Sequence, residues 1–260
     1  HLLRSHAAGV GEPLEAEVVR GMLVLLAASL SRGHSGVRPD VIEQILAVLE
    51  HDIVPLVPSR GSVGASGDLA PLAHAALVLV GEGEAMCAED GPMPGSEALM
   101  RSGLSPIRLE AKEGLALMNG TAVMTALAAL AYGRTCYLSR LSARITALSV
   151  QALEGNPYHF DADLFAAKPH PGQARVAQWL RDDLAHPAAP EVDATPINSP
   201  RLQDRYSTRC APHVIGVVED SLSWWRSFLE TELNSANDNP LIDVEAGKIL
   251  HGGHFYGGHV

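Results

Sequence analysis

Apolar residues recur every three to four positions along much of the chain, which is the spacing of amphipathic helices. Residues 15–32 and 39–51 both follow it, the second with Val41, Ile42, Ile45, Leu46 and Leu49 on one face. Asp40, following Pro39, marks a helix start, and the prolines at 55 and 58 take the chain out of helix before a glycine-rich block. We therefore predict two helices ahead of that block.

Three further helices are predicted downstream, over 69–80, over 120–153 and from Cys210 or Pro212 to about Asn234. The stretch 120–153 is the longest, and its Ala and Leu content raises the question of a membrane span. Its arginines at 134, 140 and 144 are too frequent for one, so it is predicted to be the core helix of a bundle. Between 84 and 108, glycines and prolines predict a hairpin with a short helix.

Aromatic residues make up only 5% of the chain, which favours closely packed helices over a β-sandwich. The predicted fold is mainly α, an elongated helical bundle with a small mixed region that carries the loop around residue 66. The predicted organisation is a core region over 1–184, a mobile proline-rich loop over 185–202, and a continuation of the helical bundle over 203–260.

Composition excludes several classes of protein. The chain has 47% hydrophobic residues and a formal net charge of −11, which predicts a globular protein without the clustered Lys and Arg that nucleic acid requires.

Its three cysteines, Cys87, Cys136 and Cys210, are odd in number and lack metal-ligand spacing. Reduced thiols in a cytoplasmic protein are expected. His251, His254 and His259 lack carboxylate or Cys partners nearby, so no metal site is predicted.

The stretch with the most chemical content is 59–72, Ser-Arg-Gly-Ser-Val-Gly-Ala-Ser-Gly-Asp-Leu-Ala-Pro-Leu. The amide nitrogen of Gly67 can attack the carbonyl carbon of Ala65, and loss of two waters then leaves a five-membered imidazolone with an exocyclic methylene. Glycine at 67 permits the close backbone approach, and Ser66 supplies a hydroxyl for dehydration. Because ordinary side chains are poor carbon electrophiles, such a ring would serve as a built-in cofactor. It would lie at the amino end of the helix predicted from Leu69.

The segment 58–83 resembles the histidine and aromatic amino acid ammonia-lyase family, in which this tripeptide cyclises to methylidene-imidazolone. Four more blocks resemble that family in the same order, 2–11, 112–121, 203–210 and 232–241. The resemblance implies elimination of ammonia from a small-molecule L-amino acid, with no external cofactor. It also implies a homotetramer whose active sites are shared between subunits.

Residue roles follow from the matching positions. The resemblance assigns Arg209 to the substrate carboxylate, which suits a guanidinium with two parallel donors, and places Tyr206 and Asn119 beside the electrophile Ala65-Ser66-Gly67. Tyr206 and Arg209 are expected on one helical face, three residues apart. Asn119 is also expected to cap the start of the long helix. Gln203 resembles a pocket residue, and Phe255 matches the phenylalanine that packs beside the electrophile.

The substrate is less narrowly defined. Ser5-His6 matches the dipeptide that lines the side-chain pocket of histidine ammonia-lyases, which makes histidine the first choice and urocanate the product. Tyrosine 2,3-aminomutases also carry Ser-His, and residues 254–259 look more like lyases acting on tyrosine or phenylalanine. Those lyases and the aminomutases are alternatives within the family. A non-catalytic helical oligomerisation scaffold with an uncyclised tripeptide is the alternative from another class.

The chain starts inside one motif and stops inside another, at 251–259, so we expect a fragment of about half a family subunit. The resemblance implies a catalytic tyrosine upstream and a pocket glutamate or similar residue downstream. The isolated fragment is therefore predicted to be inactive or incompletely folded.

Overall fold

The computed structural model describes residues 1–87, 91–185 and 202–260, and they form two compact units. The first unit comprises His1–Leu130 and Phe228–Val260, and the second comprises Ala131–Ser227. The chain is mainly α, as predicted. Most of the proline-rich segment predicted as a mobile loop, residues 186–201, lies outside the described residues.

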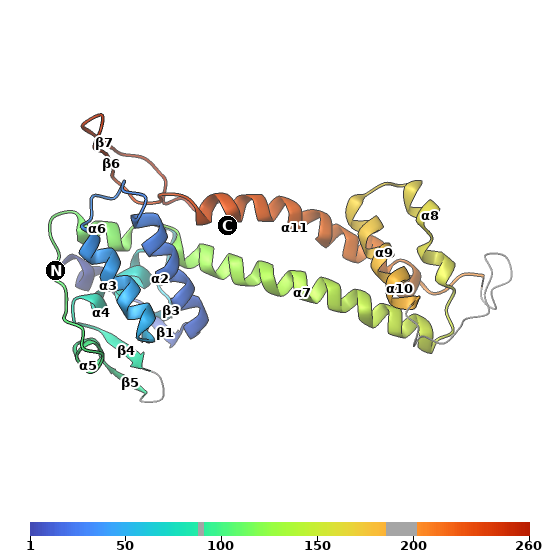
Figure 1. Cartoon of the computed structure of the whole chain (residues 1–260), viewed down its shortest axis with the longest axis horizontal. Helices are drawn as coiled ribbons and strands as arrows, with labels where there is room; N and C mark the ends of the chain where they lie inside the picture. The colour runs from blue at the N-terminus through green and yellow to red at the C-terminus, as the bar shows by residue number, and fades with distance from the viewer. Residues whose placement is uncertain (88–90, 186–201) are drawn as a thin grey trace. The chain divides into compact units, whose positions relative to one another are not determined.

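Helices dominate the first unit and follow the predicted ranges closely. In Figure 1, α2 and α3 run side by side, and the unit also contains the start of the long helix α7 and the end of α11. The helices that lie wholly or partly in it are α1 (Leu2–His6), α2 (Ala16–Leu30), α3 (Pro39–Glu50), α4 (Leu69–Leu79), α5 (Gly95–Arg101), α6 (Glu113–Met118), α7 (Ala122–Ala152) and α11 (Ala211–Leu233). The predicted helices over 15–32, 39–51, 69–80, 120–153 and 210–234 are thereby confirmed.

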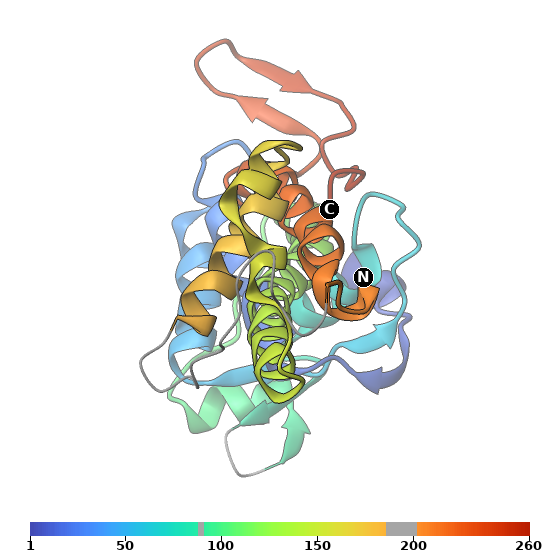
Figure 2. The same cartoon turned by 90° about the vertical axis from the view of Figure 1, so that its right-hand side faces the viewer.

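Three small antiparallel sheets complete the described part of the first unit. Strand β1 (Val10–Pro13) pairs with β3 (Pro58–Arg60), and β4 (Glu84–Cys87) lies between β2 (Ile53–Pro55) and β5 (Pro92–Pro94). The hairpin and short helix predicted over 84–108 are therefore present as β4, β5 and α5. The hairpin of β6 (Leu241–Asp243) and β7 (Lys248–Leu250) is visible in Figure 2.

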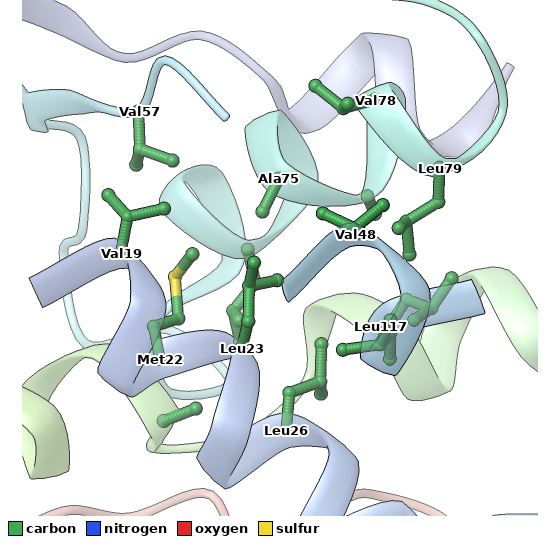
Figure 3. Packing of buried hydrophobic residues seen from close by; sticks show 14 of the residues in the cluster. Val19, Met22, Leu23, Leu26, Val48, Val57, Ala75, Val78, Leu79 and Leu117 are labelled. Carbon is green, nitrogen blue, oxygen red and sulfur yellow. The ribbon is translucent and has the colours of Figure 1, made fainter. Parts of the chain in front are cut away.

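The core of the first unit is built from α2, α3, α4 and α6. Figure 3 shows Met22, Leu23 and Leu26 of α2 packed against Val48 of α3 and Leu117 of α6. Each of these side chains is almost fully buried, and burial of one such side chain contributes about 1.5–3 kcal/mol. This core fixes the amino end of α4 and the carboxyl end of α6, between which the Ala65-Ser66-Gly67 loop lies.

The second unit is wholly helical in its described part. It contains the carboxyl-terminal part of α7 and most of α11, together with η1 (Pro157–Phe160), α8 (Ala162–Ala166), α9 (Pro171–Leu184) and α10 (Tyr206–Arg209). Phe160, Val176 and Leu180 are fully buried against Ala143 and Val150 of α7. None of the helices in the described ranges has the length and apolar character needed to span a membrane.

Candidate active site

The Ala65-Ser66-Gly67 loop connects β3 to α4. Ser66 and Gly67 both have positive φ, 50° and 80°, and Gly64 bridges Gly67 across the turn. Gly67 is buried, Ser66 is half-buried and Ala65 is exposed. The helix α4 begins two residues later, which confirms that the tripeptide lies at a helix amino end. Its dipole favours negative charge developing nearby.

Gly67 lies against two segments that are distant in sequence. A Cβ at this position would be 2.0 Å from the carbonyl oxygen of Gly120 and 3.1 Å from that of Phe255. Both contacts are to backbone atoms, which cannot move aside as a flexible side chain can. Only glycine fits here, and its amide nitrogen is the atom that cyclisation requires as nucleophile. The loop is therefore compatible with the imidazolone.

Gly120 pairs with the loop on both sides of Gly67. Its N–H donates to the carbonyl oxygen of Ser66 at 3.2 Å, and its carbonyl oxygen accepts the N–H of Asp68 at 2.9 Å. These two bonds clamp the backbone on either side of Gly67 and form a short parallel bridge. The tight turn at 64–67 is thus held from outside as well as by its own geometry.

Asp68 anchors the loop to a second helix. Its buried carboxylate accepts the N–H groups of Val123 and Met124, at 3.0 and 2.9 Å, and the hydroxyl of Ser62 at 3.1 Å. Val123 and Met124 are in the first turn of α7, where N–H groups have no intrahelical partner. Burial raises the pKa of Asp68, and these three hydrogen bonds oppose that rise. Asp68 directly precedes α4, yet its carboxylate caps α7.

Asn119 has a different place from the one predicted. It does not open the long helix, because α7 begins at Ala122 and Asn119 ends the preceding helix α6. Its side-chain amide donates to the carbonyl oxygen of Leu115 at 2.8 Å, inside α6. The expectation of a cap at the start of the long helix is therefore wrong. The turn formed by Gly120 and Thr121 separates the two helices, and Asn119 remains adjacent to the Gly120 clamp.

A network of buried polar side chains around Asn237 lies next to Gly120. Asn237 donates to the hydroxyl of Thr121 at 2.8 Å and to Glu232 at 2.9 Å, and its Oδ1 accepts the hydroxyl of Ser29 at 2.9 Å. Next to it, buried Asp238 pairs with Lys112. Asn237 lies in one of the family-like blocks, but its residue type and position alone predict no role for it. The signal in the sequence is the polar turn of residues 237–240, Asn-Asp-Asn-Pro, which ends the long helix.

His6 lies in α1, near the amino end of the chain. Its Nδ1 is 3.0 Å from the hydroxyl of Ser5 and 3.0 Å from the carbonyl oxygen of Leu2. The turn that follows is tied to α4, because the N–H of Gly9 donates to Nε2 of His74 at 3.1 Å. His74 had not been identified from the sequence. It links α4 to the segment that carries His6.

Gln203, Tyr206 and Arg209 gather in the second unit. Nε of Arg209 donates to the carbonyl oxygen of Asp204 at 2.9 Å, and a terminal guanidinium nitrogen donates to Oε1 of Gln203 at 3.2 Å. The guanidinium carbon is 4.7 Å from the centre of the Tyr206 ring, which confirms that the two residues share one face of α10. Tyr206 is 73% exposed, so the group faces outward.

The described parts of the chain thus contain two groupings of predicted site residues. Within the first unit, the tripeptide, Phe255 and the segment next to Asn119 converge at Gly67. Within the second unit, Gln203, Tyr206 and Arg209 form a cation-bearing cluster. In residues 1–87, 91–185 and 202–260, no three His, Cys, Asp or Glu side chains are arranged to hold a metal ion.

The whole chain, residues 1–260, matches a family described as aromatic amino acid lyase. It is 48% identical over 260 residues to a histidine ammonia-lyase of Gloeobacter violaceus, covering 99% of this chain and 49% of that protein. The chain therefore spans about half the length of this curated relative.

Two solved structures also match almost the whole of this chain. A histidine ammonia-lyase from Trypanosoma cruzi superposes with a TM-score of 0.88 at 39% identity, covering 99% of this chain and 47% of that one. A phenylalanine aminomutase from Pantoea agglomerans superposes with a TM-score of 0.90 at 35% identity, covering 99% of this chain and 52% of that one.

Proposed function

The chain belongs to the aromatic amino acid lyase family, and we propose that the protein containing it eliminates ammonia from L-histidine to give urocanate. The 48% identity with a histidine ammonia-lyase and the Ser5-His6 dipeptide support histidine as the first substrate. The observation that carries the proposal is the geometry of the loop. Position 67 accommodates only glycine, Gly120 forms hydrogen bonds on either side of it, and the preceding Ser66 has a positive φ.

The proposed electrophile forms from Ala65, Ser66 and Gly67. The nitrogen of Gly67 bonds to the carbonyl carbon of Ala65, and the Ala65 oxygen leaves as one water with the amide hydrogens of Gly67 and Ser66. The Ser66 hydroxyl then leaves with the Cα hydrogen of Ser66 as the second water, which forms the exocyclic methylene. Once formed, the ring supplies a carbon electrophile to which the substrate amine adds, a chemistry that no unmodified side chain offers. Gly120 and Asp68 hold the backbone in the bent conformation that this closure needs.

The remaining roles are assigned to side chains that contact the substrate. Arg209 binds the substrate carboxylate, because its fork is already oriented by Asp204 and Gln203. Tyr206 moves a proton near the electrophile, and Asn119 and Gln203 hydrogen-bond around the reacting groups. His6 lines the pocket for the substrate side chain, and Phe255 packs against the ring.

We propose that the protein acts as a homotetramer whose active sites draw residues from several subunits. The second unit exposes large apolar side chains along its two long helices, each more than half exposed, namely Tyr137, Leu138, Ile145, Leu148, Val214 and Val217. Such an apolar surface is typical of a protein interface.

The three cysteines, without the even count of a disulfide framework, support a cytoplasmic location.

The test is an intact mass measurement, with peptide mapping, on this chain and on the full-length protein. We expect a deficit of two waters in the peptide that contains Ala65-Ser66-Gly67, and ammonia release from L-histidine by the full-length protein. A Ser66→Ala variant is expected to lose the deficit and to slow turnover by roughly 10³-fold or more. An unmodified mass in the full-length protein would contradict the proposal and favour the scaffold alternative.

A second candidate is an aminomutase or a lyase acting on tyrosine or phenylalanine. The structural similarity to a phenylalanine aminomutase, at a TM-score of 0.90, and the sequence of residues 254–259 favour it. Product analysis separates the candidates, because urocanate, coumarate, cinnamate and a β-amino acid are chemically distinct. Urocanate as the main product would exclude the second candidate.

A further inference from the structure

His159, a residue with no role in the reaction proposed above, contacts the backbone of Asp204 in the Gln203–Arg209 segment. It belongs to the short helix η1, and its side chain is 14% exposed. Its Nε2 accepts the backbone N–H of Asp204 at 3.0 Å. A ring nitrogen that accepts a hydrogen bond carries no proton, so this contact requires neutral His159 with its proton on Nδ1.

The carboxylate of Asp204 is also held by the residues that connect α7 to η1. Its Oδ2 accepts the N–H of Asn156 at 2.8 Å, and a Cβ at Gly155 would be 2.8 Å from that oxygen. On its other side, the carbonyl oxygen of Asp204 accepts Nε of Arg209. Asp204 therefore connects residues 155–159 to the guanidinium of Arg209 through hydrogen bonds.

We propose that neutral His159 is a positioning residue for Arg209, acting through Asp204 to keep the guanidinium oriented for the substrate carboxylate. The proposal rests on the role of Arg209 in the proposed function. His159 fixes the Asp204 N–H, and the carbonyl of Asp204 fixes Nε of Arg209. The guanidinium donors that Asp204 and Gln203 do not use are left to pair with an anion. Binding of the substrate carboxylate thus depends on the protonation state of a side chain that never contacts it.

Protonation of His159 disrupts this arrangement in two ways. A protonated Nε2 is a donor facing the donor N–H of Asp204, and the imidazolium places a second positive charge near Arg209. Burial lowers the pKa of His159, the carboxylate of Asp204 at 3.6 Å raises it, and Arg209 lowers it further. Because the net effect lowers the pKa of His159 from its ordinary value of 6.5, the neutral form predominates at pH 7, and the hydrogen bond is lost only at a pH on the acidic side of that value.

Other charged groups lie on the elements packed around η1. Arg181 of α9 donates to the carbonyl oxygen of Phe160, next to His159. Asp161 follows η1 and accepts the N–H of Asp163 at the start of α8. Asp204 and Arg209 are thus the charged groups of the Gln203 segment that act on His159, and Arg181 is the cation of α9 at this helix.

The test compares the parent full-length protein with two variants. His159→Gln retains an acceptor that does not titrate, and His159→Leu removes the acceptor. KM and kcat for L-histidine are measured between about pH 4.5 and 8.5, a range that extends well below 6.5 because the pKa of His159 is lowered. Because the imidazole of the substrate also titrates in this range, the quantity to follow is the ratio of the parent KM to that of His159→Gln, from which the substrate's own titration cancels.

We expect this KM ratio to rise about tenfold as the pH falls below 6.5, while kcat changes by less than about threefold. At pH 8 the two proteins are expected to have similar KM values. His159→Leu is expected to raise KM about tenfold at every pH. The control His170→Gln removes an exposed histidine of the same unit and leaves the pH profile unchanged. A ratio that is flat with pH would overturn the proposal.

A second measurement does not depend on turnover. Hydrogen–deuterium exchange of the peptide containing Asp204 is expected to show protection in the parent above pH 6.5, loss of that protection at lower pH, and no protection in His159→Leu. Equal protection in the parent and His159→Leu would contradict the proposal. If the parent forms no urocanate, the proposed function fails, and exchange still decides whether His159 holds Asp204.

Discussion

The N–H of Gly120 donates to the carbonyl oxygen of Ser66, which joins the segment after α6 to the centre of the loop before α4. The carbonyl oxygen of Gly120 completes the pairing by accepting the N–H of Asp68. The proposed cyclising tripeptide is thereby held by a backbone contact that no side-chain substitution at Ser66 would remove. Gly67, enclosed between these two bonds, is the position most sensitive to added volume.

A Gly67→Ala substitution is expected to prevent formation of the ring. The added Cβ would overlap the carbonyl oxygen of Gly120, and the residue has a φ of 80°, so the loop must move and the strain is about 1–3 kcal/mol. The intact mass of the full-length variant should show no loss of two waters. Gly64→Ala is the control, because it has a similar φ of 71° but no atom within 4 Å of a Cβ. Gly64→Ala should retain the loss, and a normal deficit in Gly67→Ala would contradict the steric argument.

Acid stability should depend on Glu113. Its buried carboxylate accepts Nε of Arg38 at 2.8 Å and the N–H of Glu110 at 2.6 Å, and the Arg38 guanidinium lowers the pKa of Glu113 from 4.5 to about 2. A carboxyl with a lowered pKa in the folded state stabilises the fold above pH 4.5. That contribution is lost as the pH falls from 4.5 toward 2, because the unfolded state takes up a proton first.

Glu113→Gln is therefore expected to lower the free energy of unfolding at pH 7 by about 1–3 kcal/mol and to flatten its pH dependence below 4.5. Urea denaturation over a pH series measures both effects. Glu43→Gln, an exposed change of the same charge on α3, should leave the acid limb intact. An equally steep acid limb in Glu113→Gln and the parent would show that another group controls acid stability.

The network behind Gly120 should contribute to stability through Asn237. An Asn237→Ala substitution leaves the buried hydroxyls of Ser29 and Thr121 without this partner, which costs about 1–3 kcal/mol. Asn234→Ala is the control, since that exposed amide follows α11 and donates to the carbonyl of Glu230 in its last turn, and a change below about 0.5 kcal/mol is expected. Chemical denaturation compares the two, and equal losses would argue against a special role for the network.

Substrate binding should weaken when Arg209 becomes lysine. Lysine keeps the charge but cannot bond both Asp204 and a carboxylate in one fork, so KM in the full-length protein should rise about tenfold or more. The two-water mass deficit should persist, because the loop belongs to the first unit. Arg32→Lys, at an exposed arginine, serves as the control. An unchanged KM in Arg209→Lys would remove the carboxylate role.

Local signals in the sequence were sufficient for the helices and for the tripeptide. The spacing of apolar residues depends on neighbours three or four positions apart, so α2, α3, α4, α7 and α11 followed from it. The glycine requirement at 67 followed from the chemistry of ring closure. Tyr206 and Arg209 were placed on one face for the same local reason.

Long-range partners did not follow from the sequence. Asp68 was expected only to precede a helix, and the fold gives its carboxylate to Val123, 55 positions away. Asn237 meets Ser29 across 208 positions. Asn119 was assigned to the wrong helix because the two residues Gly120 and Thr121 form a turn that the helical spacing does not reveal. The contacts of Asp68 and Asn237 depend on packing between elements, which no local pattern encodes.

The enclosure of Gly67 by Gly120 and Phe255 also determines when the proposed reactive ring can appear. During synthesis the tripeptide leaves the ribosome long before Phe255, so a nascent chain holds a loop that lacks one wall. Gly120 can clamp the loop earlier, but the enclosure of Gly67 is complete only after the distant segment that carries Phe255 has folded onto it. An electrophile that depends on this enclosure would be absent from unfinished and misfolded chains, where it would otherwise react with cellular amines and thiols.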